Sequence, residues 1–288
     1  MSDEFLTLQE AADTLGVHYM TAYRYVRHGV LPASKVGGTW RVTVADLDAF
    51  RSGNGGATAD SSPGESRRRK APWAERLEAR LVAGDGHGAW GVVEMALSSG
   101  ASLDEVYLDV LTPAMQSIGE RWVAGELDVS IEHRATGIAF RLIGRLGPRF
   151  ARRGRTRGTV IIGAPAGERH SLPIALLADL LRGEGWEVSD LGADMPTDSF
   201  VRSALSTDDL SAVGVSVTHV DSLESAGELI GALREALAGT SVAIAVGGAA
   251  IRDAEHAQAL GADWWAPSAR EFAATLLRGG PASAADSA

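Results

Sequence analysis

The sequence contains no cysteine. This absence excludes a disulfide framework, a thiolate zinc site and a cysteine nucleophile. There is also no run of about 18 apolar residues that could cross a bilayer. The N-terminus, Met1 to Glu4, is acidic and has no apolar signal core. We therefore expect a cytoplasmic protein without a membrane partner.

The 288 residues carry a formal net charge of −10, which argues against a protein coated in nucleic acid. A whole-chain charge can nevertheless hide a local basic site. The composition changes along the chain and predicts several domains. We expect a winged helix-turn-helix over 1–52, a flexible linker over 53–72, a four-helix bundle cap over 73–152, a flavodoxin-like α/β domain over 155–280 and a disordered tail over 281–288.

The first domain begins with a short amphipathic helix over 6–16, where Thr7 and Glu10 have capping-box spacing. A second helix is predicted over 17–28 with Met20, Tyr23 and Val26 facing inward. A hairpin wing over 31–42 and a third helix over 43–50 follow. Two short helices around a tight turn are typical of a helix-turn-helix, whose second helix enters the major groove of DNA.

This stretch resembles the excisionase branch of the MerR-like winged-helix proteins, on Thr7, Glu10, Ala11, Ala12, Leu15, Gly16, Val17, Thr21, Arg24, Gly29, Trp40, Arg41, Asp46 and Leu47. The resemblance implies binding to a double-stranded DNA operator. We expect the contacts to come from His18, Tyr19, Thr21, Arg24, Lys35, Thr39 and Arg41. The alternative is an interaction module that no longer binds DNA.

This domain has little positive charge for a DNA-binding domain. Its five cationic side chains stand against six acidic ones, so we expect binding to need more than one copy. The linker ends in the basic run Arg67 to Lys70, which either adds contacts to DNA or is a solvated charge run.

Residues 73–150 have a helical pattern with breaks near Gly84 to Gly88, Ser99–Gly100 and Gly125. These breaks predict four or five helices, which suits a bundle. Within it, Trp122 is separated by nine residues from Glu132 and His133. Taken alone, these residues are interpreted as a core tryptophan and a polar surface pair.

The last domain alternates apolar runs with helical stretches. The runs lie at 159–164, 187–191, 211–217, 242–247 and 263–266, and the helical stretches lie near 172–183, 197–206, 222–238, 251–260 and 268–278. Five such units predict a parallel sheet with helices on both faces, in flavodoxin-like order. The first loop has no Gly-x-Gly-x-x-Gly, so a dinucleotide site has little support.

Three short motifs instead follow the first, third and fourth predicted strands. The first motif consists of Glu168, His170 and Pro173. The second, Ser216 to Thr218, follows after 42 residues, and the third, Gly247–Gly248, follows after 28 more. These intervals resemble those of the cobalamin-binding domain family, whose pattern is Asp-x-His-x-x-Gly, then Ser-x-Leu, then Gly-Gly. The letters differ at Glu168, Pro173 and Thr218. Without these intervals His170 would be interpreted as an ordinary loop histidine.

By that resemblance His170 is the lower axial ligand of cobalt, and Glu168 orients its ring. The nucleotide tail of the cofactor then enters a slot lined by Ser216, Thr218, Gly247 and Gly248.

The tryptophan signature joined to a winged helix is similar to that of the CarH and LitR class of light-sensing repressors, which use 5′-deoxyadenosylcobalamin. By this resemblance Trp122 and Val129 pack around the adenosyl group, Glu132 hydrogen-bonds it, and His133 binds cobalt after light has broken the carbon–cobalt bond. The resemblance also implies a homo-oligomer, a dimer or tetramer, that holds DNA in the dark, and no enzyme activity. Two alternatives stay open: a corrinoid protein of a methyltransferase system, and a regulator that senses cobalamin or another tetrapyrrole without light.

Overall fold

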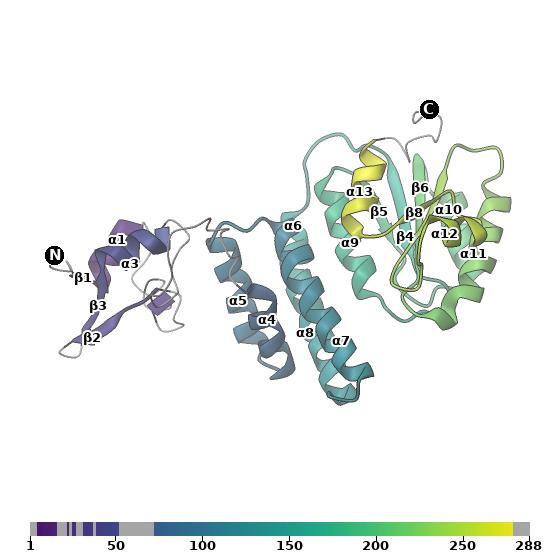
Figure 1. The fold of residues 1–288 in the computed structure, drawn as a ribbon. Coiled ribbons are helices and arrows are strands. Elements are labelled where there is room, and N and C mark those ends of the chain that lie inside the picture. Colours follow the sequence, from purple (N-terminus) through teal and green to yellow (C-terminus); the bar gives the residue numbers. More distant parts are fainter. Residues whose placement is uncertain are drawn as a thin grey trace, which may run out of the picture. The chain divides into compact units, whose positions relative to one another are not determined.

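A computed structural model describes residues 5–15, 22, 25–26, 31–36, 39–51 and 72–278 (Figure 1). The chain divides into two compact units, Met1–Pro72 and Trp73–Ala288, which are described separately. The predicted linker, except Pro72, and the predicted tail over 281–288 lie outside the described residues.

The first unit contains a three-stranded antiparallel sheet in the order β1-β3-β2. Its elements are β1 (Phe5–Thr7), α1 (Leu8–Leu15), β2 (Ser34–Val36), β3 (Thr39–Thr43) and α3 (Val44–Arg51). The wing hairpin is confirmed, whereas Leu6 and Thr7 pair with β3 instead of starting the helix. The hydrogen bonds expected of a capping box are present, since the Thr7 amide donates to Glu10 and the Glu10 amide donates back to Thr7 Oγ1.

The predicted second helix, over 17–28, lies mostly outside the described residues. Its described members Ala22, Tyr25 and Val26 are buried in the core with Leu8 and Leu47. The inward position predicted for Val26 is therefore confirmed. Met20 and Tyr23, predicted to face inward as well, lie outside the described residues.

The second unit begins with the cap. Its helices are α4 (Trp73–Val82), α5 (Gly86–Ser98), α6 (Leu103–Glu105), the π-helical η1 (Val106–Leu111), α7 (Thr112–Val123), α8 (Val129–Leu146) and the short 3₁₀ turn η2 (Gly147–Arg149). Residues 103–123 are helical throughout, so the cap is a bundle of four helices, as predicted. Gly84 and Gly125 end helices with positive φ angles of 72° and 76°, a backbone conformation that favours glycine.

The α/β domain has the predicted parallel sheet, in the order β5-β4-β6-β7-β8. Its strands are β4 (Thr159–Gly163), β5 (Glu187–Asp190), β6 (Leu210–Ser216), β7 (Ala243–Gly247) and β8 (Trp264–Ala266). The helices are α9 (Leu172–Gly183), α10 (Thr197–Ser206), α11 (Leu223–Ala236), α12 (Ala254–Ala259) and α13 (Ala269–Leu277). The flavodoxin-like expectation is confirmed.

Neighbouring residues of β4 point to opposite faces of the sheet and so belong to different cores. Val160 and Ile162 pack with α9 and α13, whereas Ile161 packs with α10, α11 and α12 (Figure 1). No helix in the described part of the chain is long and apolar enough to cross a membrane.

A buried polar contact joins the cap to the α/β domain. The hydroxyl of Tyr107, in η1, donates to Asp179 Oδ2 in α9 at 2.8 Å, and Arg182 donates to the other carboxylate oxygen at 3.1 Å. Burial and the hydrogen bond to Asp179 raise the pKa of Tyr107, so the phenol stays protonated and donates. A side chain at Gly147 would place its Cβ 2.8 Å from the same carboxylate, so the end of α8 lies against this contact too.

We expect Tyr107→Phe to lower the free energy of unfolding of the second unit by about 1–3 kcal/mol, because it leaves a buried carboxylate oxygen without its donor. Urea unfolding monitored by circular dichroism measures this change. Arg270→Gln is the control, since the contact of Arg270 with Asp109 is exposed and 3.9 Å long, and we expect it to cost less than about 1 kcal/mol. Equal stability of the two variants would contradict a stabilising role for the Tyr107 contact.

Candidate functional site

The carboxyl ends of β4, β6 and β7 form one edge of the sheet, because these strands are parallel neighbours. The loop Gly167 to Pro173 leaves β4 there, Val217 to Ser222 leaves β6, and Gly248 to Asp253 leaves β7. The three motifs found in the sequence therefore meet at one edge, as predicted. Strand order reverses between β4 and β6, where open α/β sheets bind ligands.

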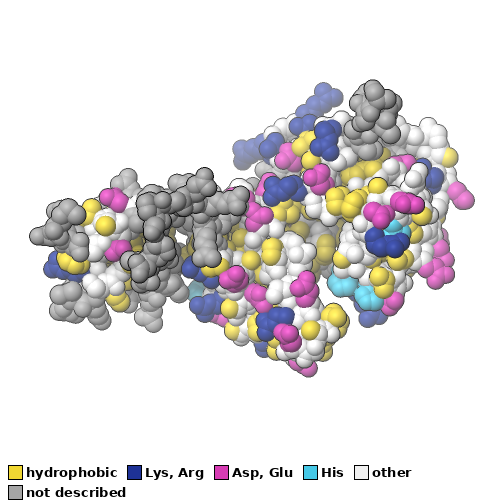
Figure 2. Space-filling view, viewed as in Figure 1, with side chains coloured by type: hydrophobic (Ala, Val, Ile, Leu, Met, Phe, Trp, Pro, Cys, Tyr) yellow, Lys and Arg dark blue, Asp and Glu magenta, His cyan; other side chains and the backbone are white. Residues whose placement is uncertain are grey.

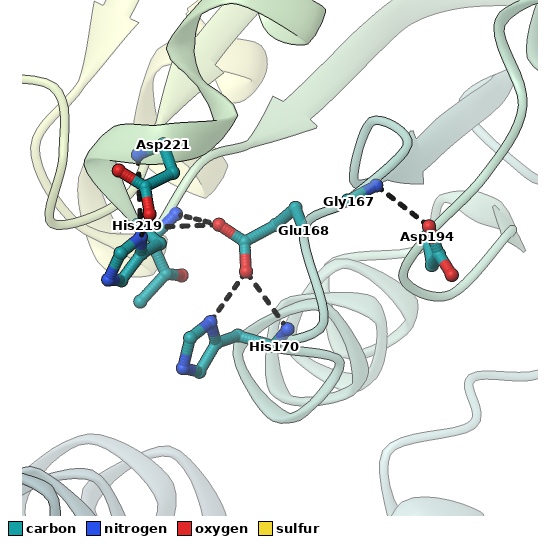
Figure 3. A network of polar contacts seen from close by, with 7 residues as sticks. Gly167, Glu168, His170, Asp194, His219 and Asp221 are labelled. Atoms are coloured by element: carbon teal, nitrogen blue, oxygen red, sulfur yellow. Dashed lines mark hydrogen bonds and ion pairs between the residues drawn. The ribbon is translucent and has the colours of Figure 1, made fainter.

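Glu168 ties two of these loops together. Its side chain is 1% exposed, and Oε1 accepts hydrogen bonds from the amide of His170 at 3.0 Å and from its ring Nδ1 at 2.5 Å. Oε2 accepts from the amides of Thr218 and His219, both at 2.8 Å (Figure 3). One carboxylate thus holds the histidine and the start of the loop after β6.

These contacts set the charge of the pair. Burial alone would raise the pKa of Glu168, but the hydrogen bonds from the His170 ring and from the three amides lower it to about 2. The same hydrogen bond raises the pKa of His170, against a smaller effect of burial, and the nearby charge of Glu132 adds to the rise. Because Nδ1 is held by the carboxylate, Nε2 is the ring nitrogen left for a ligand, on a side chain that is 49% exposed.

A residue that the sequence analysis missed holds the other side of this loop. Asp194, between β5 and α10, accepts from the amide of Gly167 at 2.7 Å, and its own amide donates to the carbonyl of Glu168 at 2.7 Å (Figure 3). Its φ of 55° lies in the left-handed region, which aspartate tolerates better than most residues. No motif or periodicity marks this position.

The two glycines at the end of β7 are needed by the chain itself. A Cβ on Gly248, whose φ is 110°, would lie 2.2 Å from the carbonyl oxygen of Val217. At Gly247, the last residue of β7, it would lie 2.5 Å from the carbonyl oxygen of Ala266, the last residue of β8. The backbones at the carboxyl ends of β6, β7 and β8 therefore approach closely here, beside Ser216 and Thr218.

The cap residues of the predicted site lie around the junction of α7 and α8. His133 Nδ1 lies 2.7 Å from Glu132 Oε2, and Thr136 donates to Glu132 Oε1 at 2.7 Å. The charge of Glu132, in the first turn of α8, makes the smallest contribution to the raised pKa of His170. His133 is the more open of the two histidines, with a side chain 75% exposed.

Large apolar side chains at this junction are uncovered. Trp122 is 43% exposed, Val129 43% and Val123 80%. The interpretation of Trp122 as a core residue is therefore wrong. Apolar surface gathered in this way is typical of a surface that another group covers.

Most of the predicted DNA contacts lie outside the described residues: His18, Tyr19, Thr21 and Arg24. Only the backbone of Lys35 and of Thr39 is described, in β2 and β3, where they pair with Trp40 and Val36. Arg41 lies in β3 opposite Ser34, on the wing. Lys35, Thr39 and Arg41 thus lie on the wing strands, and their contacts with DNA stay a prediction.

Three segments match known protein families. Residues 5–55 match a helix-turn-helix domain, residues 73–146 match a B12 binding domain found in the cap, and residues 158–275 match a B12 binding domain of the α/β type. The chain therefore combines a helix-turn-helix domain with B12-binding domains.

Corrinoid proteins are among the relatives that match part of this chain. Dimethylamine corrinoid protein 3 of Methanosarcina acetivorans is 31% identical over 41% of this chain and 54% of its own length. Trimethylamine corrinoid protein 1 of the same organism is 29% identical over 62% of this chain and 84% of its own length. The chain thus spans about half the length of the dimethylamine protein. The structure of the Methanosarcina barkeri monomethylamine corrinoid protein superposes with a TM-score of 0.62 at 22% identity, covering 72% of this chain and 97% of that one, and shows the shared fold.

We expect Glu168→Gln to lower the pKa of His170, because the substitution removes the carboxylate that stabilises the protonated ring. The pKa is measured by NMR titration of the histidine ring signals in the full chain without cofactor. Glu132→Gln is the control, since it removes only the weaker, more distant charge and is expected to lower the pKa of His170 less. An unchanged His170 pKa in Glu168→Gln would rule out the hydrogen bond as its cause.

Proposed function

We propose that the chain is a cobalamin-dependent, light-sensing regulator of transcription. It binds a DNA operator as a dark oligomer loaded with 5′-deoxyadenosylcobalamin, and light releases it. The observation that carries this proposal is the second carboxylate-held imidazole: His133 on the cap repeats the arrangement of His170, in a chain that also has a helix-turn-helix domain.

The residues present suit a corrin. In both Glu168–His170 and Glu132–His133, the carboxylate holds Nδ1, which leaves Nε2 to bind cobalt, as carboxylates behind metal-bound imidazoles do. Neutral imidazole is a suitable ligand for this metal. The exposed apolar side chains of Trp122, Val123 and Val129 provide surface for a large, mostly apolar group.

When bound, 5′-deoxyadenosylcobalamin would supply visible absorption and a carbon–cobalt bond that light breaks. His170 would hold the cofactor from the α/β domain, and Ser216, Thr218, Gly247 and Gly248 would line the space for its nucleotide tail. Trp122 and Val129 would cover the adenosyl group, and Glu132 would hydrogen-bond it through its remaining lone pairs. Once light has removed adenosyl, His133 would be the second imidazole of this chain able to hold cobalt.

Glu132 and His133 lie in the first turns of α8, so a change in the group that they hold would move this end of the helix. We infer that this shift alters the cap surface on which the oligomer depends. Loss of the oligomer would lower the affinity for DNA, because a single helix-turn-helix domain with five cationic and six acidic side chains binds DNA weakly.

One alternative has specific support. The relatives named above are corrinoid proteins, so a carrier of a methyltransferase system fits the second unit equally well. The helix-turn-helix domain favours regulation. A regulator that senses cobalamin without light differs only in the fate of the upper ligand.

The deciding experiment loads the purified chain with adenosyl-, methyl- or hydroxocobalamin. Visible spectra, light-scattering mass and gel shifts with DNA from upstream of its own gene are recorded in the dark and after green light. We expect only the adenosyl form to lose mass and DNA binding on illumination. An unchanged spectrum and mass after illumination would rule out the light switch. DNA binding that depends on cobalamin but not on light would favour a regulator that senses cobalamin. Absence of DNA binding with every form of cobalamin would favour a carrier of a methyltransferase system.

In His133→Ala we expect the illuminated spectrum to lack the change that binding of a second imidazole produces, while the dark spectrum is unchanged. Thr136→Val is the control, because it removes the other hydrogen bond to Glu132 and keeps the imidazole. An illuminated His133→Ala spectrum identical to that of the unaltered chain would exclude His133 as the ligand.

A further inference from the structure

A dense group of arginines lies where the cap joins the α/β domain. Between residues 141 and 157 the sequence has no acidic residue and seven arginines: Arg141, Arg145, Arg149, Arg152, Arg153, Arg155 and Arg157. We call these seven the arginine surface. They make up about a quarter of the 27 cationic side chains of a chain whose net charge is −10.

All seven residues are exposed. In the described parts of the chain, no ion pair joins any of them to an acidic side chain. Arg145 stacks on the ring of Trp90 at 3.6 Å, and Arg157 donates to the backbone carbonyl of Glu184 at 2.8 Å. Figure 2 shows dark blue side chains gathered along the part of this unit where the connection from α8 to β4 runs. The positive charge is therefore open to solvent and not neutralised locally.

The arginine surface suits an extended anion, because its cations are spread over three consecutive segments. Arg141 and Arg145 lie one turn apart on α8, about 6 Å along its axis, Arg149 ends the turn η2, and the other four follow in the connection to β4. Cations spread in this way can contact more than one phosphate of a DNA strand. Guanidinium groups bind phosphate oxygens through paired hydrogen bonds, which favours arginine in such contacts.

Four members of the arginine surface lie at the end of the sheet opposite the histidine edge. The connection 151–158 enters β4 at its amino end, whereas the His170 loop leaves β4 at its carboxyl end. A cofactor held by His170 therefore leaves the arginines of this connection exposed.

We propose that the arginine surface binds the phosphate backbone of duplex DNA and supplies cationic contacts that the helix-turn-helix domain lacks. This inference rests on the DNA binding of the proposed function. By this proposal the cobalamin-binding unit contributes directly to the affinity for DNA, independently of the DNA sequence. The reason is that the helix-turn-helix domain has few cations, whereas the arginine surface has an excess of them.

The test compares two triple variants of the full chain. Arg152→Gln/Arg153→Gln/Arg155→Gln removes three exposed arginines whose side chains make no hydrogen bond or ion pair with the described residues. Arg202→Gln/Arg252→Gln/Arg278→Gln removes the same charge from exposed positions elsewhere on the α/β domain. Both are loaded with adenosylcobalamin in the dark, and fluorescence anisotropy measures their binding to a random-sequence duplex of about thirty base pairs.

Each phosphate contact contributes about 0.9 to the slope of log K against log salt. We expect the first variant to have a slope smaller in magnitude by up to about 2.7, so that from about 50 to 200 mM salt it loses roughly forty-fold less affinity than the unaltered chain. The control variant is expected to keep the original slope.

Equal salt slopes for all three chains, or equal reductions of the slope in both variants, would contradict DNA binding by the arginine surface and would leave the light switch untouched. A reduced slope in the first variant with no effect of light would support the surface and count against the switch. Absence of DNA binding by the unaltered chain would overturn both. Loss of binding to polyglutamate but not to DNA in the first variant would assign the surface to an acidic protein and overturn the proposal.

Discussion

The buried carboxylate of Glu168 is the interaction on which the histidine edge depends. A charged group can be buried only if hydrogen bonds or opposite charge replace its water. Here two oxygens accept from four donors, and these donors come from the loops after β4 and β6. Asp194 then fixes the backbone on either side of Glu168. The orientation of one imidazole is thus determined by three loops.

These contacts explain why two departures from the cobalamin-binding pattern leave the arrangement intact. Thr218 donates through its backbone amide, so this contact does not depend on its side chain. Glutamate in place of aspartate at 168 adds one methylene, and its carboxylate reaches both the ring of His170 and the amides across the edge. A motif defined by side-chain letters does not capture a contact made by the backbone.

Features with a local signal were predictable from the sequence. The strands of the α/β domain appear as short apolar runs, and the histidine edge follows from parallel strands with marked carboxyl ends. Contacts between distant segments have no such signal. Tyr107 and Asp179 are 72 residues apart, and the π-helical turn that carries Tyr107 has an ordinary helical pattern. Likewise β1 becomes a strand only through its pairing with β3.

The Tyr107–Asp179 contact lies beside one end of α8, near Gly147. His133 lies in the first turns of the same helix, about 21 Å away along its axis. A rotation of the helix by about ten degrees about its carboxyl end would carry His133 through roughly 4 Å, more than the length of a metal–nitrogen bond. In a helix of this length, a small change of angle at one end is therefore a displacement of chemical size at the other.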